Sequence, residues 1–264
     1  AMRAKEPAKP LAGTNTLGIN ELIGRGESNF IGSPKNRRHN INVGIEKLKG
    51  TIIAPGEEFS FNKNICPVEK FTGYLPELVI KSNDTVPEYG GGLCQVSSTV
   101  YRAAMDAGLT IVQRKNHSYA VQYYAVPWGH GADATTYCGG IDFRFKNDTP
   151  ASILIWPYIK EKDLLFFDFY GTNDGRKVTL EKAVQFDRKS DGSLKAYWKR
   201  TIIKNGEETK ETFNSVYKSP ALFHKKEELP NPAPATDPAP NPQTPTPPVE
   251  NNQPSPTQTP QTIN

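Results

Sequence analysis

Apolar residues recur at helical spacing in two segments in the first half of the chain. The segment RHNINVGIEKLKG has Asn40 as a candidate N-cap and Gly50 as a candidate stop. The segment CQVSSTVYRAAMDAG ends at Gly108, a residue type that terminates many helices. The two apolar stripes consist of Ile41, Ile45 and Leu48, and of Val96, Val100, Ala103 and Ala107. The sequence therefore predicts two short amphipathic helices.

Strand patterns dominate the rest of the folding region. The segment TIIAPGEEFSF is β-branched and interrupted by Pro-Gly, which predicts a strand, a turn and a second strand. Further β-branched and aromatic segments are LTIVQR, SYAVQYY, IDFRF, ASILIWPYI, DLLFFDFYG, RKVTLEKAVQF, LKAYWKRTII and ETFNSVYK. Helices followed by strands favour an α+β fold, with two short helices packed on an antiparallel sheet and a small β subdomain after it.

The composition changes at both ends of the 264-residue chain. Twelve of the 23 prolines lie within residues 230–264, which contain no Lys, Arg, Phe, Tyr or Trp. Such a stretch cannot bury enough apolar surface to fold, so we predict a disordered Pro/Thr-rich tail. Residues 1–12 have the composition of a flexible lead-in. An α+β domain over residues 13–172 and a β-rich extension over residues 173–229 remain.

The charge balance and the absence of several motifs argue against whole classes of function. The tail contributes −2 to the net charge of +4, and the resulting +6 on the remainder is too modest to predict nucleic-acid binding. The three cysteines form no C-x-x-C pair and no glycine-rich phosphate loop is present, so we predict no metal and no cofactor. No apolar run is long enough to span a membrane. Anchoring of the full-length protein would need a segment not present in this sequence.

The strongest chemical signal is the segment YGGGLCQVSSTV. Its three glycines, residues 90–92, allow a sharp turn and leave room for a substrate beside the backbone. Cys94 follows at the predicted helix start, where unpaired N–H groups and the helix dipole stabilise a thiolate. Main-chain donors of the same turn could hold an oxyanion. Cys94 is therefore a candidate nucleophile, and a buried core thiol is the alternative interpretation.

A nucleophilic thiol needs a base and a group that orients the base. His117 is the nearest downstream histidine, at a predicted strand start, and Asp133 lies at the start of a later strand. Together they would form a Cys-His-Asp arrangement in which Asp133 orients the His117 ring. This order is similar to that of the papain-like and transglutaminase-like superfamily, so a transglutaminase-like fold is one expectation.

Other residues compete for these roles. His130 is an alternative base, and Asp142 competes with Asp133, although the strand IDFRF predicts that Asp142 faces outward. Ser97 and Ser98 are less suitable as reactive hydroxyl groups, because hydroxyls inside a helix usually bond to carbonyls of the same helix.

Several strings closely resemble the VanW-domain family of exported and membrane-anchored bacterial proteins. They are NRRHNINVGIEKLKGTIIAPGEEFSFN, GYLPELVI, VPEYGGGLCQVSSTVYRAAMDAGL, KNHS, GADATTY and IDFRFKNDTPASILI. The resemblance covers about residues 36–160 and continues more loosely through DLLFFDFYG. It implies a location on the extracellular face of the bacterial envelope and an association with vancomycin resistance, but no particular activity. The motif residues are Gly90, Gly91, Gly92, Cys94, Gln95, Ser97, Ser98 and Thr99, followed by His117 and Asp133.

Two cysteines depart from the family pattern. Cys66 stands where the family commonly has Gly before Pro, and Cys138 stands where a small residue is usual. Because both appear together in a chain of an exported family, the resemblance implies a disulfide between Cys66 and Cys138, with Cys94 left as the free thiol.

Two functions fit these features. The first is a thiol acyl-transfer enzyme (amidase, peptidase or transpeptidase) acting on the peptide of peptidoglycan, with oxyanion or substrate contacts from Gly91, Gly92, Gln95, Ser97 and Ser98. The second is a noncatalytic module that binds cell-wall peptide or glycan, or an accessory module linked to glycopeptide resistance, with stacking surfaces from Tyr123, Tyr124 and Trp128.

Overall fold

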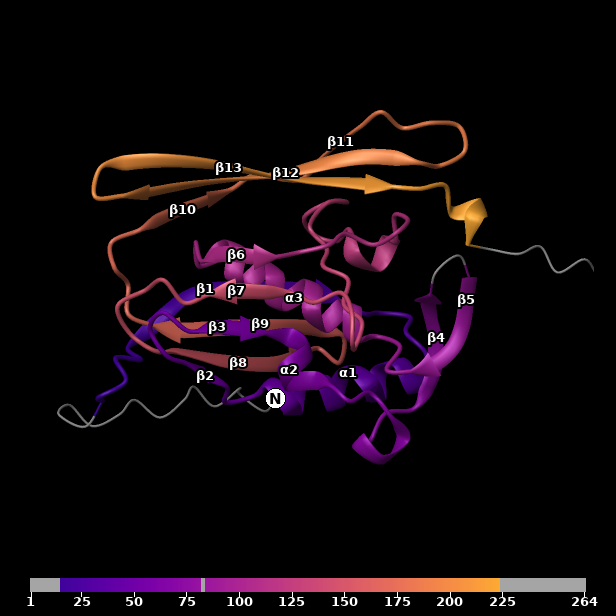
Figure 1. The fold of residues 1–264 in the computed structure, drawn as a ribbon, viewed down its shortest axis with the longest axis horizontal. Helices are drawn as coiled ribbons and strands as arrows, with labels where there is room; N and C mark the ends of the chain where they lie inside the picture. Colours follow the sequence, from indigo (N-terminus) through magenta and orange to yellow (C-terminus); the bar gives the residue numbers. More distant parts are fainter. Residues whose placement is uncertain (1–14, 82–83, 224–264) are drawn as a thin grey trace, which may run out of the picture. The chain divides into compact units, whose positions relative to one another are not determined.

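The computed structural model describes residues 15–81 and 84–223, and its elements confirm the predicted α+β class (Figure 1). Every pairing between its named strands is antiparallel. The predicted lead-in, residues 1–12, and the predicted tail, residues 230–264, lie outside the described residues.

The helices and strands follow one another in a mixed order. The helices are α1 (Lys35–Leu48), α2 (Phe61–Ile65) and α3 (Leu93–Asp106), with short 3-10 turns at Lys70–Thr72, Gln122–Tyr124 and Pro220–Leu222. The first strands are β1 (Glu21–Asn29), β2 (Ile52–Ile53), β3 (Glu58–Ser60), β4 (Pro76–Lys81), β5 (Asp84–Tyr89) and β6 (Thr110–Gln113). The later strands are β7 (Arg144–Lys146), β8 (Ile153–Lys160), β9 (Leu164–Gly171), β10 (Lys177–Leu180), β11 (Val184–Phe186), β12 (Leu194–Lys204) and β13 (Glu207–Tyr217).

The four-stranded sheet β1-β9-β8-β2 supports α3, the nucleophile helix, whose first turn contains Cys94. Phe167 and Phe169 of β9 are fully buried in the cluster that includes the apolar face of α3. In β1, a side chain on Gly24 or Gly26 would overlap main-chain atoms of α3. The two glycines therefore let the strand and the helix pack at backbone distance, which fixes α3 firmly against the sheet.

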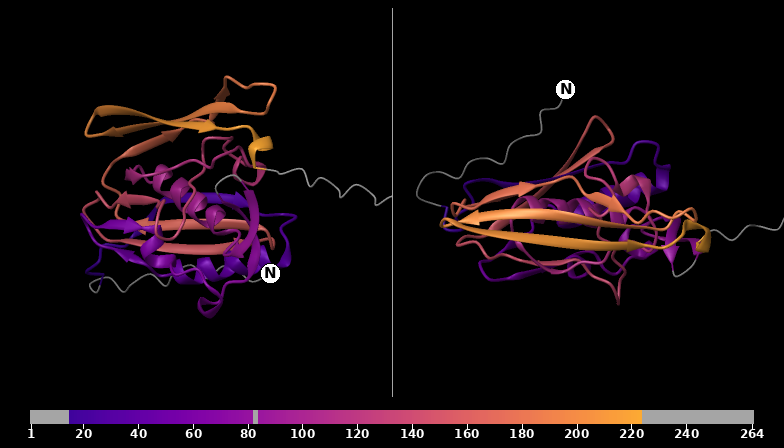
Figure 2. Two further views of the ribbon diagram at one scale, coloured as in Figure 1. Left: turned by 45° about the vertical axis from the view of Figure 1, so that its right-hand side comes forward. Right: turned by 90° about the horizontal axis from the view of Figure 1, so that it is seen from above.

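The remaining strands form three smaller sheets. The order β3-β7-β6 gives a three-stranded sheet, and β4 pairs with β5. In the fourth sheet β12 pairs with β10, β11 and β13, and β12 and β13 form a long hairpin (Figure 2). Trp198 of β12 is fully buried with its ring edge-on to Tyr101 of α3. The extension beyond β9 therefore shares its core with the nucleophile helix.

One of the two predicted helices ends where the sequence predicts, and the other begins earlier than predicted. α3 ends as predicted, with Gly108 in the left-handed conformation at φ +67°. α1 begins at Lys35, so the prediction of Asn40 as its cap is wrong. The Asn40 side chain instead bonds to both main-chain groups of Leu75 and to the Gly91 carbonyl. A residue type that often caps helices is used here to tie the helix to neighbouring turns.

The predicted strand SYAVQYY is absent. Residues 122–124 form a 3-10 turn, followed by an irregular loop. Arg102 of α3 holds the end of this segment and the loop after it, because its guanidinium donates to the carbonyls of Tyr124 (2.5 Å), Val126 (2.9 Å) and Ala132 (3.0 Å). Because these carbonyls bond to a side chain, they are not available to a neighbouring strand.

The predicted disulfide is present and joins Cys66, at the end of α2, to Cys138. The two cysteines are 72 positions apart, and Cys94 is free. We expect a Cys66→Ala, Cys138→Ala variant to lose about 4 kcal/mol of unfolding free energy, because the closed loop restricts the unfolded chain. Urea titration would measure the loss, with reduced wild type as the control that should unfold at the variant's midpoint. An unchanged midpoint in the variant would contradict this prediction.

Candidate active site

Cys94 lies in the first turn of α3 and is partly exposed. Its sulfur is 3.6 Å from both the Thr135 hydroxyl and the Thr136 carbonyl oxygen. The N–H groups of Leu93 and Gln95 donate to carbonyls of the glycine turn, whereas the N–H of Cys94 has no acceptor among the described residues. A free N–H beside the sulfur is the group that an oxyanion on an attacked carbonyl would need.

The glycine turn has the conformation that its sequence predicts. Gly90 and Gly92 have φ values of +84° and +113°, which side-chain-bearing residues rarely adopt. A Cβ on Gly92 would also come within 3.1 Å of Arg37. The turn is therefore restricted to glycine both by its backbone and by its close approach to α1.

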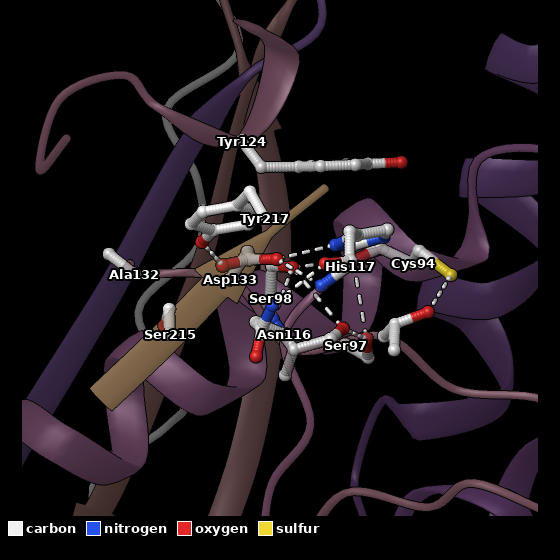
Figure 3. A network of polar contacts seen from close by, with 12 residues as sticks. Cys94, Ser97, Ser98, Asn116, His117, Tyr124, Ala132, Asp133, Ser215 and Tyr217 are labelled. Atoms are coloured by element: carbon white, nitrogen blue, oxygen red, sulfur yellow. Dashed lines mark hydrogen bonds and ion pairs between the residues drawn. The ribbon is translucent and has the colours of Figure 1, made fainter. Parts of the chain in front are cut away.

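His117 is buried and held by a single carboxylate oxygen. Its ring Nδ1 lies 2.6 Å from Asp133 Oδ2, and its main-chain N–H donates to the same oxygen at 2.8 Å. The ring stacks on Tyr124 with 4.2 Å between centroids, as Figure 3 shows. Its Nε2 is buried without a hydrogen-bond partner of good geometry among the described residues. This nitrogen is nevertheless close enough to the Cys94 sulfur for each group to shift the pKa of the other.

Asp133 is fixed from its other side by the C-terminal extension. Its Oδ1 accepts from the Tyr217 hydroxyl of β13 (Figure 3). The same oxygen accepts from Arg114 at 3.1 Å. Beside the Tyr217 contact, the main-chain N–H of Lys218 donates to the Ser118 carbonyl at 2.8 Å. The last strand therefore positions the His-Asp pair, a role that its strand pattern does not indicate.

The charges of the three groups favour a thiolate beside an imidazolium. Burial alone would raise the pKa of Asp133, but hydrogen bonds from His117 and Tyr217 and the charges of His117 and Arg114 lower it well below its ordinary value. Burial opposes charging of His117, yet its contacts with Asp133 and Cys94 raise its pKa to about 9. Burial likewise disfavours the thiolate, yet His117 and the Thr136 and Thr135 contacts lower the pKa of Cys94 to about 7. Near pH 7 about half of the thiol is therefore ionised, far more than at its ordinary pKa of 9.0.

Three residues predicted to contact the substrate, Gln95, Ser97 and Ser98, form hydrogen bonds within the protein through their side chains. Ser97 and Ser98 donate to the Cys94 carbonyl at 3.2 and 2.7 Å and also to the Ala134 carbonyl. Gln95 is fully buried, and its amide donates to the Asn29 carbonyl at 2.9 Å. These side chains hold the loop that carries Asp133 and the start of α3 in place.

The alternative residues lie in other environments. His130 is buried with its ring 6.0 Å from that of Tyr217, and burial lowers its pKa. The expectation that Asp142 faces outward is wrong: it is 9% exposed, and its carboxylate accepts from Ser60 at 2.6 Å and from the Asn62 N–H at 2.9 Å. Asp142 thus stabilises the first turn of α2, a helix that the sequence analysis missed.

The predicted stacking surface is only partly exposed. Tyr123 is 37% exposed, but Tyr124 is buried over His117 and Trp128 packs against the buried Trp198. Of these three aromatic residues, Tyr124 covers His117, and Tyr123 is the one with an exposed side chain.

Four further residues around the site were not predicted from the sequence: Arg37, Arg102, Arg114 and Tyr217. Their contacts at the site join residues 17 to 84 positions apart and have no local signature. One of the four, Arg102, has a signal in the sequence: it is a charged residue among the small apolar residues of a predicted helix.

Comparison with known proteins places these residues in a family context. A family model described as VanW like protein matches residues 36–168. Two curated relatives are the uncharacterized protein YoaR of Bacillus subtilis (strain 168), 40% identical over 135 residues, and the vancomycin B-type resistance protein VanW of Enterococcus faecalis (strain ATCC 700802 / V583), 31% identical over 134 residues. The alignments cover 51% and 50% of this chain and 43% and 48% of the relatives, so the chain spans about half of their length. No solved structure matches the chain, and a transglutaminase-like fold stays a prediction.

Two further properties concern the described residues alone. None of their helices is long and apolar enough to cross a membrane. Within the same part of the chain, no group of three or more His, Cys, Asp or Glu residues is placed to hold a metal ion.

Proposed function

Because the chain belongs to the VanW family, we propose that it is a thiol acyl-transfer enzyme of the bacterial cell envelope that acts on an amide of the peptidoglycan peptide. One observation carries the proposal: His117, held by Asp133 at 2.6 Å through Nδ1, directs its other ring nitrogen into the buried region beside the Cys94 thiol. A noncatalytic wall-binding module would have no use for this alignment.

The chemistry would proceed in two steps. The Cys94 thiolate attacks the amide carbonyl carbon, and the main-chain N–H of Cys94 stabilises the resulting oxyanion. His117 donates a proton to the departing amine as the C–N bond breaks, which leaves a thioester on Cys94. The neutral His117 then takes a proton from the incoming nucleophile, and the acyl group leaves the sulfur. Water in this second step gives hydrolysis, and an amine gives transpeptidation.

The envelope location rests on two independent observations. Disulfides such as Cys66–Cys138 persist in oxidising compartments outside the cytosol. The name of the Enterococcus relative refers to vancomycin resistance, which supports a role at the cell wall. Peptide amides of the wall are therefore the substrate class that we propose.

Incubation with purified peptidoglycan tests the proposal directly. Wild type should change the muropeptide profile seen by mass spectrometry, and Cys94→Ala should leave it as in the untreated wall. An acyl-enzyme on the Cys94 peptide would identify the intermediate. Identical profiles for wild type and Cys94→Ala would reject catalysis and favour the binding module.

A further inference from the structure

Arg37 is a buried cation whose hydrogen-bond partners are neutral. The residue is 7% exposed, and it donates to the Ser33 hydroxyl at 2.6 Å and to Gln95 Oε1 at 2.8 Å. Its guanidinium carbon lies 4.4 Å from the ring centroid of Tyr123. Among the described residues no carboxylate forms an ion pair with it. A buried charge without a counter-charge is costly, so its retention calls for an explanation.

The guanidinium lies at the start of the nucleophile helix. Its acceptor Gln95 directly follows Cys94, and its stem lies against Gly92, where a Cβ would come within 3.1 Å of Arg37 Cγ. The Tyr124 hydroxyl is influenced by both Arg37 and the Cys94 thiol. Burial and the nearby Cys94 raise the pKa of the Tyr124 hydroxyl, while the charge and hydrogen bond of Arg37 oppose that rise.

We propose that Arg37 binds a carboxylate of the substrate next to the amide that Cys94 attacks; this inference rests on the proposed function. A guanidinium has five N–H donors in a planar fork that matches the two oxygens of a carboxylate. Ser33, Gln95 and the Tyr124 hydroxyl take one donor each, so two of the five donors remain for a ligand. The substrate class is then a peptide with a free carboxylate beside the reactive amide, and the ligand supplies the missing counter-charge.

Stabilisation of the Cys94 thiolate is the competing role for Arg37, because its acceptor Gln95 is the next residue along the chain. Loss of such a role would lower the ionised fraction of the thiol and slow every electrophile equally. A carboxylate site would instead discriminate between reagents by their charge. Iodoacetate and iodoacetamide make that comparison, because both alkylate the thiolate with release of iodide and only iodoacetate carries a carboxylate.

The expected result is a change in the ratio of the two alkylation rates. Arg37→Gln should slow iodoacetate on the order of tenfold, the size of one charge-assisted hydrogen bond, while iodoacetamide changes by less than about twofold. Arg38→Gln is the matched control, since this neighbour pairs with Asp163, and it should leave the ratio unchanged. Mass spectrometry of the Cys94 peptide reports both rates, because the other two cysteines are in the disulfide.

Equal slowing of both reagents, or an unchanged iodoacetate rate, would overturn the inference. If Arg37→Gln does not fold, the wild type still decides: acetate should protect Cys94 from iodoacetamide saturably, and sodium chloride at equal ionic strength should not. Absence of this protection would also overturn it. Failure of the proposed function appears separately, as a peptidoglycan profile independent of Cys94, and charge discrimination in that case would still support the carboxylate site.

Discussion

Replacement of Asp133 by Asn is expected to lower turnover on peptidoglycan by about 10⁴-fold, the loss typical when a catalytic histidine is left in the wrong tautomer. The cause is the acceptor oxygen beside His117 Nδ1, at 2.6 Å. The side-chain nitrogen of the substituted asparagine cannot accept a hydrogen bond from the ring, so the neutral His117 ring carries its proton on Nε2 instead of Nδ1. In that tautomer Nε2 cannot take a proton from the thiol or from the incoming nucleophile. The comparison of wild type and Asp133→Asn turnover by mass spectrometry measures this loss.

The same substitution should also destabilise the fold. The Asp133 carboxylate accepts from the ring and main chain of His117, from Arg114 and from the Tyr217 hydroxyl. An asparagine offers one acceptor oxygen, so its NH₂ group would face buried donors and leave Arg114 without a counter-charge. We expect a loss of about 3 kcal/mol in unfolding free energy at pH 7, as for other broken buried ion pairs.

The loss of unfolding free energy in Asp133→Asn should depend on pH. The pKa of Asp133 is depressed in the folded state, so its stabilisation is complete above its ordinary pKa of 3.8 and is lost as pH falls through the lower folded value. The difference between wild type and Asp133→Asn should therefore be full at pH 7 and smaller below about pH 4. Urea titrations at pH 7 and pH 3 measure it. Asp187→Asn, which changes an exposed partner of Lys195, is the control with little expected effect. Equal stability of Asp133→Asn and wild type at pH 7 would contradict the buried network.

The parts of the site that the sequence predicted have local signals. A glycine turn before a helix marks Cys94 because the backbone conformation itself demands glycine at Gly90 and Gly92. The disulfide was predictable because Cys66 and Cys138 depart together from a family pattern, and the structure joins them. The glycine turn is thus predictable from residue types alone, and the disulfide from comparison with the family pattern.

The parts that were missed depend on contacts between distant segments. β1 contains Gly24 and Gly26, which weaken any strand pattern, and their value appears only where α3 packs on them. The loop after His117 has the composition of a strand but is held by the guanidinium of Arg102. Tyr217 lies 84 positions from Asp133, in a strand whose sequence indicates only a sheet. Tertiary contacts decide these cases, so no local pattern contains them.

The base is the second element whose removal should have a large effect. His117→Ala is expected to lower turnover by at least about 10³-fold, the upper part of the range for loss of general acid–base catalysis. It should also change the thiol itself. Burial by itself raises the pKa of Cys94, and His117 is the main group that lowers it to about 7. Without the imidazole, the thiol pKa should rise above its ordinary value of 9.0.

The pH profile of iodoacetamide alkylation separates this effect from simple loss of structure. In wild type the rate should rise through a midpoint near pH 7, and in His117→Ala that midpoint should move above pH 9. At pH 7 the thiolate fraction then falls from about one half to about one hundredth. The midpoint, and not the rate at one pH, is the measurement, because a more basic thiolate is also more nucleophilic. His130→Ala, the other histidine considered as a base, should keep the wild-type midpoint. A midpoint that moves in His130→Ala and not in His117→Ala would show that His117 is not the base. The His117–Asp133 contact would then no longer support catalysis by Cys94.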